Sequence, residues 1–293
     1  MKNFVFNKPK KFVYLFIFYN FLFLGKIYAI DMVFDLVKPN GEVIIMQTPD
    51  GQRFGLWGKN VSYPAPTLFI FAGTVEQSLG ESYFRQCGNQ LAEEGFLCVS
   101  LDLPGHGLEK RAEEPEGLSA WRYRTDRDED FVTPFTDQAR NVLDYLIQAG
   151  YTDSERIGAC GTSRGGFMAL QLTAVEKLVK VTAVFCPVIE LMALYEFKDV
   201  TNRDFVISLS MKAKAGQLID RSLWLIIGDR DERVGTDNTI EFAREVTNLS
   251  LEQSKKADVT FIVQTEPGGH TTPADAPDKA AKWILKKIKP DEL

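Results

Sequence analysis

Residues 158–170 read GACGTSRGGFMAL, which places Ser163 at the centre of the pattern GTSRG (161–165). The preceding residues, RIGAC (156–160), are typical of a short buried strand, and residues 165–176 have helical character. A G-x-S-x-G pattern between a strand and a helix predicts a tight turn that holds the serine clear of the backbone. The stretch therefore indicates either a serine nucleophile or an ordinary glycine-rich turn.

Apolar runs alternate with helical patterns on both sides of this stretch, which predicts βαβ units in one α/β domain with a mainly parallel sheet. A short turn at 49–51 joins the first two strands, so that edge is expected to be antiparallel. Two segments, 108–133 and 187–222, are expected to be inserts, and the first of them is expected to be irregular. Strands are expected at 42–48, 53–57, 67–73, 96–103, 156–160, 181–186, 223–228 and 259–263, and helical segments at 81–94, 135–147, 165–176, 237–248 and 276–288.

The first 29 residues differ from the rest. Four lysines precede the apolar run 12–24, which is shorter than the ~20 residues of a comfortable membrane span, and Ala29 suits cleavage. The pattern predicts a signal peptide at 1–29 and one folded domain at 30–293, hence a secreted or periplasmic protein with no stable membrane span after cleavage. An uncleaved N-terminal membrane anchor is the alternative.

Composition excludes several classes of partner and cofactor. The net charge is −6 and no dense run of Lys or Arg exists, so no nucleic-acid partner is expected. With only two histidines and no C-x-x-C, a zinc site is not expected, and the catalytic residues discussed below imply no metal or organic cofactor. The four cysteines lie in apolar strand-like or helix-like runs and are predicted to be buried free thiols.

A serine nucleophile needs a base and an acid from other loops. His270, in EPGGHTTP after the last strand, is predicted to be the base, because one class of hydrolase has the order serine, acid, histidine. His106, in LDLPGHG, is expected at the rim of the site. Asp231, in the loop after strand 223–228, is the predicted acid. Other carboxylates remain open as alternatives: Asp229, Glu232 and Glu190.

The reaction also needs donors for an oxyanion. The backbone N–H of Arg164 is predicted to be one donor, and that of Thr74, or of neighbouring Gly73, the other. For the Arg164 side chain, a place on the helix surface is favoured over contact with an anionic substrate. Trp121 and Tyr195, in the two inserts, are predicted to contact substrate, with packing of the inserts as the alternative.

Five segments occur in one order: FAGT (71–74), LDLPGHG (101–107), GTSRGG (161–166), GDRDERV (228–234) and GGH (268–270). With them the chain resembles an α/β-hydrolase over roughly 40–290. It is similar to the group of dienelactone hydrolases, acyl esterases and prolyl-oligopeptidase-type catalytic domains. The resemblance implies an eight-stranded sheet and the triad Ser163, Asp231 and His270. The chain departs from the pattern in two ways. It is expected to be too short to include the β-propeller that gates the active site of prolyl oligopeptidases. The loop expected to supply an oxyanion donor, called the oxyanion loop below, reads Ala72-Gly73-Thr74 and lacks the histidine-glycine pair that begins this loop in many esterases.

The sequence thus predicts a serine hydrolase that cleaves a carboxylic ester through an acyl-enzyme, with a small-molecule ester or peptide as its partner and an unknown oligomeric state. A serine peptidase of aminopeptidase type or an acyltransferase would use the same triad. A non-catalytic binding protein on the same fold is the alternative from another class.

Overall fold

The computed structural model describes residues 36–288. The chain divides into two units, Met1–Leu36 and Val37–Leu293, and the description that follows concerns the second. The expected signal peptide, 1–29, lies outside the described residues, so it and the domain limits that depend on it stay predictions. Within the described part of the chain, no helix has the length and apolar character needed to cross a membrane.

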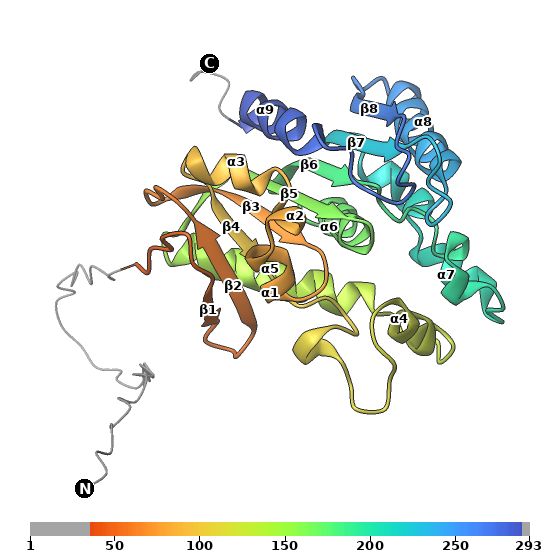
Figure 1. Ribbon diagram of the computed structural model, residues 1–293, viewed down its shortest axis with the longest axis horizontal. Coiled ribbons are helices and arrows are strands. Elements are labelled where there is room, and N and C mark those ends of the chain that lie inside the picture. The colour runs from red at the N-terminus through yellow and green to blue at the C-terminus, as the bar shows by residue number, and fades with distance from the viewer. Residues whose placement is uncertain (1–35, 289–293) are drawn as a thin grey trace, which may run out of the picture. The chain divides into compact units, whose positions relative to one another are not determined.

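One eight-stranded sheet runs through the described residues in the order β1-β2-β4-β3-β5-β6-β7-β8 (Figure 1). β1 pairs with β2, and β2 with β4, in antiparallel fashion, and all the other neighbours are parallel. The predicted α/β fold with an antiparallel edge is confirmed. The strands are β1 Ile44–Gln47, β2 Arg53–Gly58, β3 Ala65–Phe71, β4 Leu97–Ser100, β5 Thr152–Thr162, β6 Val179–Phe185, β7 Ser222–Gly228 and β8 Asp258–Gln264.

Helices cover both faces of the sheet, which is why every residue of β3 is buried and its sequence reads as one apolar run. α3 and α9 lie along one face, while α5 and α6 pack together on the other (Figure 1). The helices are α1 Val75–Gly80, α2 Ser82–Arg85, α3 Gly88–Glu93, α4 Leu118–Thr125, α5 Val132–Gln148, α6 Arg164–Val175, α7 Arg203–Leu209, α8 Thr236–Glu252 and α9 Ala276–Ile288.

Three local expectations were wrong. The segment 108–133, expected to be irregular, contains α4, whose buried Trp121 and Arg124 anchor it without an amphipathic pattern. The helical segment 81–94 is broken into α2 and α3 at Gln86, which has a φ of 49°. The strand expected at 96–103 ends at Ser100, and residues 101–103 continue without regular structure.

The four cysteines, Cys87, Cys98, Cys160 and Cys186, are free and buried, as predicted. Burial raises the pKa of Cys98 and of Cys160, so these two thiols stay neutral and serve as apolar packing in the core between the sheet and α3.

Candidate active site

Ser163 occupies the turn between β5 and α6 with φ 55° and ψ −118°, a left-handed conformation that is unusual for a residue with a side chain. The flanking glycines permit the turn. A Cβ at Gly161 would lie 2.3 Å from the carbonyl of Gly165, and one at Gly165 would lie 1.8 Å from the carbonyl oxygen of Phe71. The Ser163 N–H donates to Phe185 O at 2.9 Å, which ties the strained residue to the end of β6.

His270 lies in the loop between β8 and α9, with its ring against the serine. Its Nε2 accepts a hydrogen bond from Ser163 Oγ at 2.9 Å. Two contacts fix the loop: Cys186 Sγ donates to Thr271 O at 3.2 Å, and Gln86 Nε2 donates to Thr272 Oγ1 at 3.1 Å. The imidazole is therefore positioned by the ends of β6 and α2 as well as by its own loop.

Asp231 follows β7 and is buried, with an exposed fraction of 2 %. Its Oδ2 accepts a hydrogen bond from His270 Nδ1 at 2.7 Å. Its Oδ1 accepts the N–H groups of Arg233 and Val234 at 3.1 and 3.2 Å. The backbone thus holds the carboxylate toward the ring, and the three predicted residues form one continuous hydrogen-bonded chain.

The alternative carboxylates lie elsewhere. Asp229 accepts the N–H of Glu266 at 3.1 Å, and Glu232 is exposed. Glu190 lies beside Ser210, and burial raises its pKa. None of the three contacts His270 in the described structure.

The loop after β3 presents two free amide groups. Thr74 caps α1, with its Oγ1 accepting the N–H of Gln77 at 3.1 Å. The neighbouring amides are used within the loop: that of Ala72 donates to Ser78 Oγ, and that of Val75 donates to a carboxylate. The N–H groups of Gly73 and Thr74 have no acceptor among the described residues. Arg164 supplies the first amide of α6, which has no partner within its helix.

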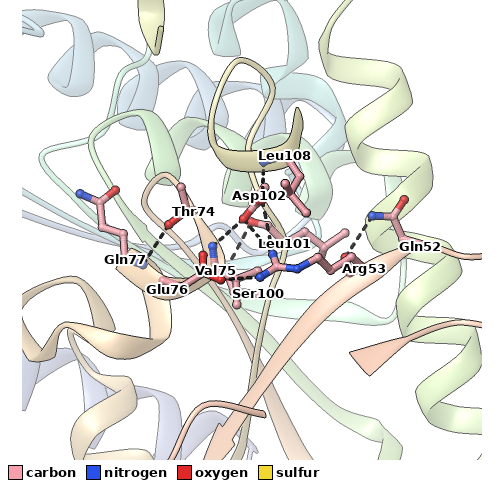
Figure 2. Close-up of polar contacts among 10 residues, drawn as sticks. All are labelled: Gln52, Arg53, Thr74, Val75, Glu76, Gln77, Ser100, Leu101, Asp102 and Leu108. Atoms are coloured by element: carbon pink, nitrogen blue, oxygen red, sulfur yellow. Dashed lines mark hydrogen bonds and ion pairs between the residues drawn. The ribbon is translucent and has the colours of Figure 1, made fainter. Parts of the chain in front are cut away.

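Asp102, which sequence reasoning missed, anchors this loop (Figure 2). Its side chain is buried at the turn that follows β4. Oδ1 accepts the N–H of Val75 at 2.7 Å and Oδ2 accepts that of Leu108 at 2.9 Å, while the Arg53 guanidinium approaches within 3.4 Å. A single carboxylate therefore joins the start of α1 to the loop that carries His106.

His106 lies at the rim of the site, as expected, and does not contact Ser163. Its Nδ1 donates to Pro104 O at 3.0 Å, and its buried Nε2 has no partner among the described residues. Burial, reinforced by the charge of Arg164, lowers the pKa of His106 to about 4. The ring is therefore neutral near pH 7.

The two residues predicted to contact substrate differ in position. Trp121 is fully buried, donates from Nε1 to Pro104 O at 2.7 Å and stacks on Phe131, so it packs its insert onto the domain. Tyr195 is 73 % exposed and lines a cavity of about 420 Å³ that also includes Arg233. Contact of Tyr195 with substrate stays a prediction. No group of His, Cys, Asp or Glu within residues 36–288 is arranged to hold a metal ion.

The family model of the prolyl oligopeptidase family matches residues 90–289, which is more than half of the chain. The chain belongs to this family. It accordingly has the α/β-hydrolase fold, as the five sequence segments predicted. Ser163, Asp231 and His270 all lie within the matched residues. No curated protein matches the sequence.

Solved structures of both peptidases and esterases share the fold of this prolyl oligopeptidase family member. Dipeptidyl peptidase 4 of Porphyromonas gingivalis has a TM-score of 0.61 at 17% identity, over 84% of this chain and 35% of that one. Acylaminoacyl peptidase of Pyrococcus horikoshii has a TM-score of 0.59 at 17% identity, over 86% of this chain and 42% of that one. A cold-adapted esterase from an Arctic intertidal metagenomic library has a TM-score of 0.56 at 18% identity, over 86% of this chain and 100% of that one. The chain spans about a third of the dipeptidyl peptidase's length, and at these identities the likeness concerns the fold.

Proposed function

We propose that the protein hydrolyses carboxylic esters, with Ser163 as nucleophile, His270 as general base and Asp231 as the acid that orients it. The observation that carries the proposal is the hydrogen-bonded chain from Ser163 Oγ through His270 to Asp231, at 2.9 and 2.7 Å. These distances lie within the range needed for proton transfer between nucleophile and base. The strained turn at Ser163 supports it, because such strain is maintained at functional sites.

In the proposed reaction, Ser163 Oγ attacks the ester carbonyl while His270 Nε2 takes the hydroxyl proton. Asp231 stabilises the imidazolium through Nδ1–H. The oxyanion accepts the N–H of Arg164 and that of Thr74 or Gly73. His270 then gives its proton to the leaving alkoxide, which departs and leaves an acyl-serine. A water molecule, deprotonated by His270, attacks the acyl carbon, and the acid is released as Ser163 recovers its proton.

Charge favours an ester over the substrate of an aminopeptidase, which would carry an ammonium group next to the scissile bond. Two guanidinium groups, those of Arg164 and Arg233, border the site, and the only carboxylate paired with either within the described residues is that of Glu196. A substrate ammonium would be repelled there. An acyltransferase uses the same triad and differs only in the acceptor that replaces water.

Fluorophosphonate labelling of the full-length protein tests the activated serine without a known substrate. We expect the label on the peptide that contains Ser163, and its loss in Ser163→Ala and His270→Ala. Ser208→Ala is the matched control, since its hydroxyl is exposed on α7 and should not affect labelling. Comparison of 4-nitrophenyl butyrate with its anilide tests ester preference, and added alcohols and amines test transfer. A folded protein that resists the label would contradict the proposal.

A further inference from the structure

The side chain of Arg164 lies over the oxyanion loop and not on the surface of α6. Its Nη2 donates to Gln77 Oε1, on the first turn of α1, at 3.3 Å. A Cβ at Gly73 would lie 3.1 Å from Nη2 and 3.3 Å from the ring of His106. The guanidinium therefore lies against the loop that presents the free amides of Gly73 and Thr74.

Arg164 forms no direct ion pair among the described residues, although the carboxylate of Glu196, which is paired with Arg233, is near enough to raise its pKa. Its Nε is buried without a hydrogen-bond partner, and its one side-chain contact is a neutral amide. Burial lowers the pKa of Arg164, and the charge of Arg233 lowers it further. A largely buried cation whose Nε has no acceptor and which has no carboxylate bonded to it is destabilising, so such an arrangement is expected where a ligand supplies the missing charge.

Arg233 supplies a second cation at the same site, two residues after Asp231. Its Nη2 donates to both carboxylate oxygens of Glu196, at 2.7 and 2.9 Å, and its guanidinium lies 4.3 Å from the centre of the Tyr195 ring. Its Nη1 is buried without a partner. These contacts fix the planar group with the two N–H groups of Nη1 unused, and Glu196 balances only one of the two arginine charges.

A buried arginine with a structural role looks different in this protein. Arg124 donates from Nε and Nη2 to the two oxygens of Glu114, at 2.8 and 2.6 Å, so its charge is balanced inside the fold. The cavity beside Arg233 is also lined by Lys198 and Arg203, against the single acid Glu232. The excess positive charge thus continues from Arg233 into this cavity.

We infer that the substrate carries a carboxylate, which binds to Arg164 and Arg233 while its ester lies at Ser163. This inference rests on the proposed ester hydrolysis and names its substrate class. The planar fork of arginine suits a carboxylate, to which it donates two parallel hydrogen bonds.

Two pairs of esters test it with the full-length protein. Mono-4-nitrophenyl glutarate is compared with its methyl ester, which places the charge on the acyl side. 4-Acetoxybenzoate is compared with its methyl ester, which places it on the leaving group. Each kcat/KM is divided by the rate constant of alkaline hydrolysis of the same compound. We expect the charged member of one pair to be favoured about tenfold to a hundredfold.

In Arg164→Gln and Arg233→Gln this preference should fall by at least about tenfold, whereas Arg164→Lys should retain part of it. Arg140→Gln is the matched control, because Arg140 is exposed on α5 and pairs with Asp137 and Glu176. Equal kcat/KM for charged and neutral esters in both pairs would overturn the inference and leave ester hydrolysis intact. So would an equal loss for charged and neutral esters in Arg164→Gln. Absence of label on Ser163 would overturn both proposals.

Discussion

Replacement of Asp102 by asparagine tests how the oxyanion loop is held. Asp102 has an exposed fraction of 6 %, and its two oxygens accept two different backbone N–H groups, those of Val75 and Leu108 (Figure 2). Asparagine has the same shape but only one oxygen. In either orientation of the amide, its NH2 faces a backbone N–H, and one of these donors loses its acceptor.

The magnitude follows from that lost acceptor. A buried donor left unsatisfied costs about 1–3 kcal/mol, so we expect the free energy of unfolding of Asp102→Asn to fall by about 2 kcal/mol. If the orphaned amide is that of Val75, the preceding amides of Gly73 and Thr74 shift. Full loss of one oxyanion donor lowers kcat by about 10²–10³, so a partial displacement should lower it about tenfold with little change in KM.

Urea denaturation gives the change in stability, and initial rates with 4-nitrophenyl butyrate give kcat and KM. Asp130→Asn is the control, since Asp130 also accepts two backbone N–H groups, at 2.7 and 3.1 Å, but accepts both through Oδ1, which asparagine retains, and is exposed at the start of α5. Asp130→Asn should leave kcat unchanged. If Asp102→Asn also kept the wild-type kcat and lost no more stability than this control, the positioning role of Asp102 would be refuted.

Two further predictions concern the turn and its rim. In Gly165→Ala the new Cβ would meet Phe71 O at 1.8 Å, so we expect a loss of about 3 kcal/mol or more of unfolding free energy and loss of fluorophosphonate labelling; a wild-type Tm would contradict this. Burial, and then the charge of Arg164, lower the pKa of His106 to about 4 in the folded protein. As the pH falls, His106 is therefore protonated at a higher pH in the unfolded chain than in the folded one, which favours unfolding. Wild-type stability should therefore decline from pH 6.5 toward pH 4 by about 3 kcal/mol relative to His106→Gln, as measured by urea denaturation. Parallel curves for the two proteins would show that His106 does not titrate in this way.

The positions of Ser163, Asp231 and His270 could be predicted because each follows a strand that the sequence makes plain. In a parallel sheet the carboxyl ends of the strands meet at one edge, so loops far apart in sequence come together without further information. The same reasoning located the loop of Gly73 and Thr74. Which of its amides reaches an oxyanion stays a prediction, because that depends on the position of the substrate.

The parts that were missed depend on contacts that leave no periodic signal. Asp102 and Val75 are 27 residues apart, and nothing near either one indicates their hydrogen bond. Trp121 lies in a helix without an amphipathic pattern, so the sequence did not indicate which of its side chains are buried. An aromatic residue in a polar segment therefore suggested a substrate contact, whereas Trp121 is buried and anchors the helix. Arg164 was expected on a helix surface, because a helix start does not reveal which side chains turn back toward a neighbouring loop.

The position of Arg164 follows from the same glycines that create the turn. Gly161 and Gly165 let the start of α6 approach the end of β3 so closely that no Cβ fits between Gly165 and Phe71 O. This approach brings the start of α6 against Phe71 and Ala72, and the Arg164 side chain lies over the residues that follow them, where it contacts Gln77. With Arg164 there, the proposed anion binding and the proposed transition-state stabilisation both depend on this one tight contact, and a substitution that loosens it should weaken both together.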